Sequence, residues 1–92
     1  MKYILVGTLD SGWTGHHKER VKACKAKAGE FGITFDAVYY THGVYDFVDV
    51  IEASDAYVVL AFSMWYSKIG YGHINAMPAF GEEVLDRIDK IS

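Results

Sequence analysis

A carboxylate inside an apolar run is the first feature of this sequence that could do chemistry. Asp49 stands between Val48 and Val50 in a segment typical of a strand. A carboxylate buried in a sheet is costly and its pKa rises, unless it finds a partner or faces a wet cleft. A perturbed carboxylate in a cleft is a candidate for function. Pairing with a Lys, His or Tyr is the structural alternative.

Four other side chains could share a cleft with Asp49. In a strand, alternate residues point to the same face, so Tyr40 and Tyr45 share the parity of Asp49 along the predicted hairpin. His73 and Asn75 share one parity of a later strand with Met77, and would supply polar groups if that parity faces the cleft. The candidate ligand-binding residues are therefore Tyr40, Tyr45, Asp49, His73 and Asn75, and no catalytic residue is assigned.

The segment from Thr41 to Val44 has the composition of a tight hairpin connection. Gly43 is expected to supply a positive φ. The Asp46 carboxylate can accept hydrogen bonds from loop amides and fix the hairpin. We interpret Gly43, Tyr45 and Asp46 as a structural motif, with acid–base catalysis by Asp46 as the alternative.

The histidines, the cysteine and the basic residues have ordinary structural interpretations. The four histidines show no spacing typical of a metal site, so neither a metal nor a cofactor is predicted, although His42 or His73 could still join a carboxylate. Cys24 is the only cysteine, which rules out an internal disulfide, and it lies on an apolar helix stripe as an inert thiol. The basic residues of 18–27 indicate a solvated helix face or, alternatively, a docking face for an acidic partner; they are Lys18, Arg20, Lys22, Lys25 and Lys27.

Length and composition exclude several classes of protein. The chain has 92 residues, which is one domain spanning 1–92, and 51% are hydrophobic and 23% charged, as in globular proteins. A net charge of −3 gives no basic footprint for nucleic acid. The apolar run at 56–66 is too short for a membrane span, which needs about 20 residues. A lone cysteine and no signal peptide lead us to expect a cytoplasmic protein.

Periodicity and turn residues predict an α+β fold. The expected elements are a strand at 2–9, a helix at 16–31 capped by Ser11 or Thr14, hairpin strands at 33–41 and 44–53, a helix from 54–55 to 68, a strand at 71–79 and a short helix from 82. Pro78 cannot donate to a ladder, so the last strand belongs at a sheet edge. This order predicts a ferredoxin-like βαββαβ domain with an extra C-terminal helix. Its antiparallel sheet has the strand order 4-1-3-2, with both long helices on one face.

The hairpin strands are apolar and aromatic on both faces, yet two helices can cover only one face. The uncovered face must meet another surface, and a second copy of the chain is the commonest one. We therefore expect a homodimer.

The segment from Thr41 to Asp55, THGVYDFVDVIEASD, resembles the signature of the GYD-domain family, in which a Gly-x-Tyr-Asp turn precedes an apolar strand and an acidic helix start. The resemblance extends from about residue 20, and Gly70 precedes the Ala79-Phe80 pair as it does in that family. It implies a dimeric α+β barrel in which two ferredoxin-like sheets pack face to face. Ligand-binding domains of leucine-responsive and asparagine-type regulators have a similar hairpin. Two residues depart from the family pattern. Asp49 stands where relatives usually have an aliphatic residue, and Pro78 stands where they often have a polar one.

These observations leave more than one function open. One hypothesis is a non-catalytic dimeric module that binds a small, partly apolar molecule or a partner protein. The alternative is a cofactor-independent enzyme, of isomerase or oxygenase type, with a cleft in the dimer barrel, and fold-level analogy alone supports it. A purely structural oligomer needs no cleft at all. A pocket lined by both Asp49 and His73 would favour chemistry.

Overall fold

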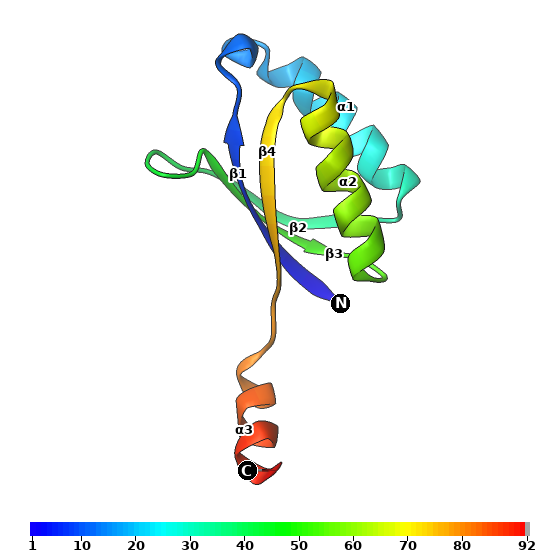
Figure 1. Cartoon of the computed structure of the whole chain (residues 1–92), viewed down its shortest axis with the longest axis vertical. Helices are drawn as coiled ribbons and strands as arrows, with labels where there is room; N and C mark the ends of the chain where they lie inside the picture. The colour runs from blue at the N-terminus through cyan, green and yellow to red at the C-terminus, as the bar shows by residue number, and fades with distance from the viewer. Residues whose placement is uncertain (92) are drawn as a thin grey trace.

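A computed structural model describes residues 1–91 of the chain. The elements follow one another as β1 (Lys2–Leu9), a 3₁₀ turn η1 (Ser11–Trp13), α1 (His17–Glu30), β2 (Thr34–Tyr40), β3 (Phe47–Glu52), α2 (Ala56–Ile69), β4 (Gly72–Pro78) and α3 (Glu82–Ile91). Figure 1 shows this arrangement, with α3 standing apart from the body of the fold. The ferredoxin-like α+β fold with an additional C-terminal helix is confirmed.

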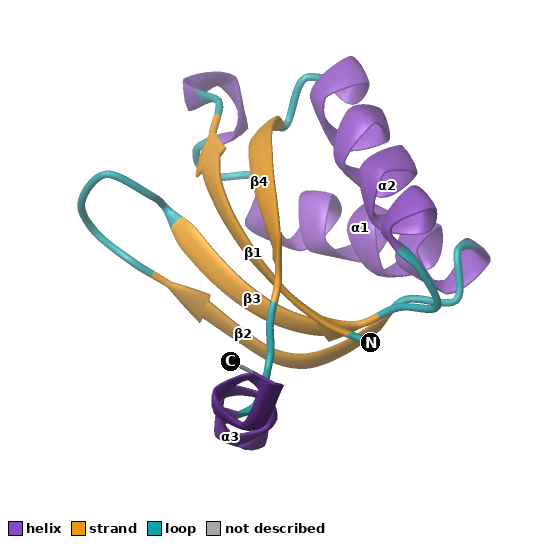
Figure 2. Ribbon diagram, turned by 60° about the horizontal axis from the view of Figure 1, so that its bottom comes forward, coloured by secondary structure: helices purple, strands orange, loops and turns teal. Residues whose placement is uncertain are grey.

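The four strands form one antiparallel sheet in the order β2-β3-β1-β4, which is the predicted order read from the other edge. Pro78 ends β4, an edge strand, where its missing N–H removes no ladder hydrogen bond from the centre of the sheet. Both α1 and α2 cover the same face of the sheet (Figure 2). We call this the helix side, and the opposite face the open face.

Strand register assigns each residue to one of these faces. Leu5 on β1 pairs with Asp49 on β3 and Ala76 on β4, and this row lies on the helix side. Val6, the next residue, pairs with Val48 and Asn75 on the open face. A one-residue slip would exchange the two faces, so register decides which polar side chains can meet.

A β-bulge between Phe35 and Ala37 changes the alternation of β2. Phe35 pairs with Ile51 on the helix side, but Ala37 pairs with Val50 on the open face. Strict alternation would put Phe35 and Ala37 on one face, but the bulge inserts one residue between them and places them on opposite faces.

The two long helices begin differently. The Asp55 carboxylate accepts a hydrogen bond from the Val58 amide at 3.1 Å, as expected for a cap at the N-terminus of α2. Helix α1 has His16 at its N-cap position with no side-chain cap, so neither Ser11 nor Thr14 caps it. Ser11 instead begins η1, where the Asp10 carboxylate accepts a hydrogen bond from the Gly12 amide.

The hairpin connection is also longer than predicted, because β3 starts at Phe47 and leaves residues 41–46 outside both strands. Gly43 does not have a positive φ; that conformation belongs to Gly15, Gly32, Gly70 and Gly72. The expectation for Gly43 is therefore wrong. A six-residue loop turns gradually, so it does not need the left-handed conformation of a two-residue turn.

The core lies between the sheet and the helices. Side chains of β1, β3 and α2 fill it, and its most buried members are Leu5, Ile51, Phe62 and Tyr66. Near the start of β4, Trp13, Trp65 and Tyr66 each place a ring against Tyr71, with centroids 4.5 to 5.7 Å apart. This end of the helix side is closely packed by rings.

Candidate functional site

Beside this ring cluster the helix side is hollow. A cavity of about 320 Å³ lies between α1 and the sheet. Helix α1 lies farther from the strands than α2, which packs against β4. Thirteen side chains line the cavity, and they are His17, Arg20, Val21, Cys24, Lys25, Phe35, Val38, Tyr40, Phe47, Asp49, Phe62, Tyr66 and Ile74.

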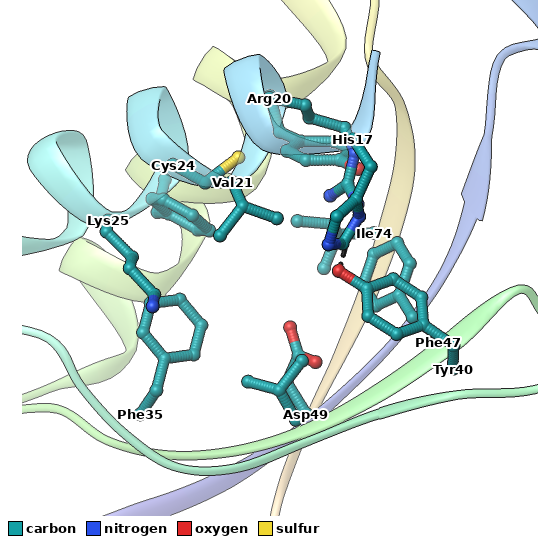
Figure 3. Close-up of a pocket in the computed structure, with 13 residues that line it drawn as sticks. His17, Arg20, Val21, Cys24, Lys25, Phe35, Tyr40, Phe47, Asp49 and Ile74 are labelled. Atoms are coloured by element: carbon teal, nitrogen blue, oxygen red, sulfur yellow. Dashed lines mark hydrogen bonds between the residues drawn. The ribbon is translucent and has the colours of Figure 1, made fainter. Parts of the chain in front are cut away.

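Asp49 carries the only carboxylate in that lining. It comes from the middle of β3, on the helix side, and only 8% of its surface is exposed. Its Oδ1 atom is buried and has no hydrogen-bond partner within residues 1–91. Figure 3 shows the carboxylate pointing into the cavity. Burial raises the pKa of Asp49 to about 6, and the positive charge of Arg20 opposes this rise.

Arg20 brings a buried cation to the same cavity, from α1, with 6% of its surface exposed. Its Nη2 donates to the Tyr40 hydroxyl at 3.0 Å and lies 3.3 Å from His17 Nδ1. Its Cζ atom also lies 5.8 Å from the centroid of the Tyr40 ring. These contacts hold Arg20 and Tyr40 together as one polar group, with Arg20 on the helix wall of the cavity and Tyr40 on the strand beside Asp49 (Figure 3).

Two further polar groups in the lining stay neutral near pH 7. Burial raises the pKa of the Tyr66 hydroxyl to about 12 and that of the Cys24 thiol to about 11, in each case against the charge of Arg20. The Tyr66 hydroxyl has no hydrogen-bond partner in the described part of the chain. It can therefore act as a hydrogen-bond donor in the cavity, whereas Cys24 is a buried free thiol, as predicted.

The predicted ligand-binding residues divide into two groups. Tyr40 and Asp49 both line the cavity, but Tyr45, His73 and Asn75 do not. Register places His73 opposite Thr8 and Asn75 opposite Val6, in the rows of the open face, whereas Ile74 between them reaches the cavity. At this edge strand His73 Nδ1 lies 3.4 Å from Ser67 Oγ of α2, so its side chain is next to the end of that helix and not in the cavity. Tyr45 lies in the loop before β3, where its carbonyl oxygen accepts a hydrogen bond from Thr41 Oγ1 at 2.6 Å.

Sequence reasoning missed Arg20, which was placed in a solvated basic stretch. A signal was present, because Arg20, Cys24 and Ala28 follow one another at intervals of four and are the three buried residues of α1. An arginine in line with a buried thiol and a buried alanine must turn inward. Lys18, Lys22 and Lys25 are exposed, as expected.

Asp46 has the structural role that its position in the motif suggested, although with a different partner. Its Oδ2 accepts a hydrogen bond from the Leu9 amide at 2.7 Å, and its own amide donates to the Gly7 carbonyl at 2.8 Å. The carboxylate thus fastens the hairpin loop to the end of β1, and not to the amides of its own loop.

A family model for the GYD domain matches residues 3–88. The chain belongs to the GYD-domain family. The matched range contains every residue of the cavity lining, so the site lies within the GYD domain. No match to the chain was found among curated proteins.

A solved structure with the same fold comes from Burkholderia phenoliruptrix. It is a 5-chloro-2-hydroxyhydroquinone dehydrochlorinase in complex with 2,5-dihydroxybenzoquinone. The two chains are 13% identical, with a TM-score of 0.63, and the match covers 90% of this GYD domain chain and 97% of the enzyme chain. At this identity the likeness shows the fold alone.

Within residues 1–91, no group of three or more His, Cys, Asp or Glu side chains is arranged to hold a metal ion. No helix in this same range has the length and apolar composition needed to cross a membrane.

Proposed function

We propose that the cavity between α1 and the sheet binds a small, partly apolar molecule with a polar group that contacts Asp49. The observation that carries this proposal is the buried, unpartnered Oδ1 of Asp49, which faces the cavity. A buried carboxylate oxygen without a partner is costly, and a ligand that donates a hydrogen bond to it would remove that cost.

The size and lining of the cavity narrow the class of ligand. A cavity of roughly 150 Å³ admits benzene, and ligand pockets begin at about 300 Å³, so 320 Å³ suits a molecule of one or two rings. Phe35, Phe47 and Phe62 provide apolar contacts for such a ring. Asp49 calls for a hydroxyl or N–H on the ligand, and Arg20 with Tyr40 calls for an oxygen acceptor.

The test is a titration of the protein with small hydroxylated ring compounds, beginning with 2,5-dihydroxybenzoquinone and catechol. Binding is detected from chemical-shift changes in ¹⁵N spectra. We expect saturable shifts in α1 and β3, and at least about tenfold weaker binding by Asp49→Asn. The control is Asp86→Asn on α3, which makes the same chemical change far from the cavity. Equal binding by the parent and Asp49→Asn, or shifts confined to the open face, would contradict the proposal.

We also propose that the GYD domain forms a homodimer through its open face. The central strands present Ile4, Val6, Val48 and Val50 there, and Tyr39 on β2 is 64% exposed. The chain exposes 6288 Å², whereas a compact monomer of 10.3 kDa exposes about 5,400 Å². Its radius of gyration is 14.7 Å, against about 12 Å expected. Helix α3, which stands apart and exposes Leu85, Ile88 and Ile91, contributes to this extended shape. A second copy on the open face would cover the aliphatic residues of the central strands.

Sedimentation velocity at micromolar concentration tests the dimer. We expect the parent to sediment as a dimer and Val48→Lys to sediment as a folded monomer, because a charge in a sheet-to-sheet interface would be buried unpaired. Val44→Lys is the control, since Val44 lies exposed in the hairpin loop. A parent that is monomeric and stably folded would refute this proposal.

We propose in addition that the protein is cytoplasmic, because its single cysteine suits a reducing compartment.

A further inference from the structure

The cavity contains a base on the sheet wall and hydrogen-bond donors from the same wall and from α1, an arrangement that can do more than bind. We propose that Asp49 transfers protons on a bound ring ketone, so that the GYD domain interconverts the keto and enol forms of its ligand or moves a conjugated double bond. This inference rests on the proposed ligand-binding function and goes beyond it to an activity.

Asp49 has the position and the environment of a proton acceptor. Its Oδ1 is buried, lacks a partner within residues 1–91 and points into a space large enough for a ring. A carboxylate that only stabilised the fold would be paired, as Asp46 is with the Leu9 amide. Its pKa of about 6 leaves it ionised at neutral pH and more basic than an ordinary aspartate, which suits a general base.

Tyr40 and Arg20 form a donor group in the same cavity, with Tyr40 on the sheet and Arg20 on α1. The Tyr40 hydroxyl accepts a hydrogen bond from Arg20, so its own proton is free to donate to a ligand oxygen. The nearby guanidinium charge makes that hydroxyl a stronger donor and would itself stabilise a negative oxygen. Tyr66 adds a second hydroxyl, which stays protonated because of its raised pKa of about 12.

The chemical step balances without a cofactor. The Asp49 carboxylate takes a proton from the carbon next to the ligand carbonyl, and the C–H electron pair forms a C=C bond. The carbonyl π pair moves to oxygen, which Tyr40 and Arg20 would stabilise as an enolate. Protonated Asp49 then returns its proton to the same carbon, to a conjugated carbon, or to the enolate oxygen, and the last of these gives the enol. Nothing is oxidised or reduced, and no group leaves.

The experiment is hydrogen–deuterium exchange of two ketones, 2-tetralone and 3-cyclohexenone, with the full chain in D₂O, followed by ¹H NMR. Binding of each ketone is measured separately from chemical shifts in ¹⁵N spectra. We expect exchange next to the carbonyl to exceed the buffer rate, and 3-cyclohexenone to convert to its conjugated isomer. Asp49→Asn should lose about 10²-fold or more of the acceleration, while Asp86→Asn keeps it.

The pH profile separates a proton-transfer role from a merely structural one. The accelerated rate should rise with pH through about 6, the pKa of Asp49, and then level off. The titratable groups facing Asp49 in the cavity are His17, Arg20, Cys24 and Lys25 from α1, Tyr40 from β2 and Tyr66 from α2. His17→Gln removes the one imidazole of this set and should leave the midpoint in place.

The outcomes distinguish this inference from the proposed function. A ketone that binds in the cavity without faster exchange would overturn proton transfer and leave ligand binding standing. Acceleration that Asp49→Asn retains would also overturn it. If neither ketone nor any hydroxylated ring compound binds, both proposals are wrong.

Discussion

The two faces of the sheet are built from the same strands but differ in what they carry. The helix side is covered by α1 and α2, yet it contains a cavity with a buried carboxylate and a buried guanidinium. The open face has no helix over it, yet its central strands present mainly aliphatic side chains. A sheet covered on one side normally shows the reverse, with apolar residues inside and polar residues facing water.

This inversion shows that the two faces serve different purposes. Packing alone would favour an aliphatic residue at position 49, so the charge there serves a purpose other than core stability. Stability and solubility alone would favour polar residues at positions 6, 48 and 50, so the aliphatic residues there indicate a partner surface. The predictions below change one face while leaving the other intact.

The largest expected effect comes from filling the helix side beside the cavity. A Cβ at Gly7 would lie 2.1 Å from Cζ of Phe47 and 2.8 Å from the His73 carbonyl oxygen. Gly7→Val should therefore cost about 3 kcal/mol or more in unfolding free energy, measured by urea denaturation. Thr8→Val, one residue along on the open face, should change stability by less than about 1.5 kcal/mol. Similar losses from the two variants would show that the faces are not packed differently.

The second effect concerns the charge on the helix side. Between about pH 4 and 6 the folded chain binds a proton at Asp49 that the unfolded chain has released, so the stability of the parent falls as pH rises through that window. Asp49→Asn lacks this loss. Between pH 4 and pH 7 the variant should therefore gain about 1–3 kcal/mol of unfolding free energy relative to the parent. Screening by water in the cavity sets where in this range the gain falls. Thermal and urea unfolding across this range measure it, and a constant difference would mean that Asp49 is not buried.

The third effect isolates Arg20, whose charge lowers the pKa of Asp49 against the effect of burial. Removing that charge with Arg20→Gln should raise the pKa of Asp49 above about 6, measured from the ¹³C shift of its carboxyl carbon. Lys22→Gln removes an exposed charge from the same helix and should leave the Asp49 titration nearly unchanged. Equal shifts in both variants would mean that α1 acts through its total charge, and not through one buried residue.

The sequence predicted the fold far better than the site. Apolar periodicity and the position of Pro78 were enough for the element order and the strand order, because each element must bury one face. Whether a residue of β4 lines the cavity depends on which of its two alternating sets of side chains shares a face with Asp49, with β1 lying between the two strands. Alternation in the sequence does not determine that register. His73 and Asn75 were therefore expected beside Asp49 but lie on the other face. Arg20 was missed because a cation in a basic helix resembles its solvated neighbours.

The smallest expected effect lies in the hairpin loop, which belongs to neither face. Gly43 has no positive φ, and no atom lies within 4 Å of the position its Cβ would take. Gly43→Ala should therefore change stability by no more than about 0.5–1 kcal/mol and in the stabilising direction, because alanine restricts the unfolded chain. Gly70 is the matched control, since it also has open space around it but has a φ of 94° at the end of α2. Gly70→Ala should cost about 1 kcal/mol for its left-handed backbone alone. If thermal unfolding shows the same loss for both variants, the loop at 41–46 holds Gly43 in a strained conformation. The tight turn with a positive φ at Gly43, as predicted from the sequence, would then be correct.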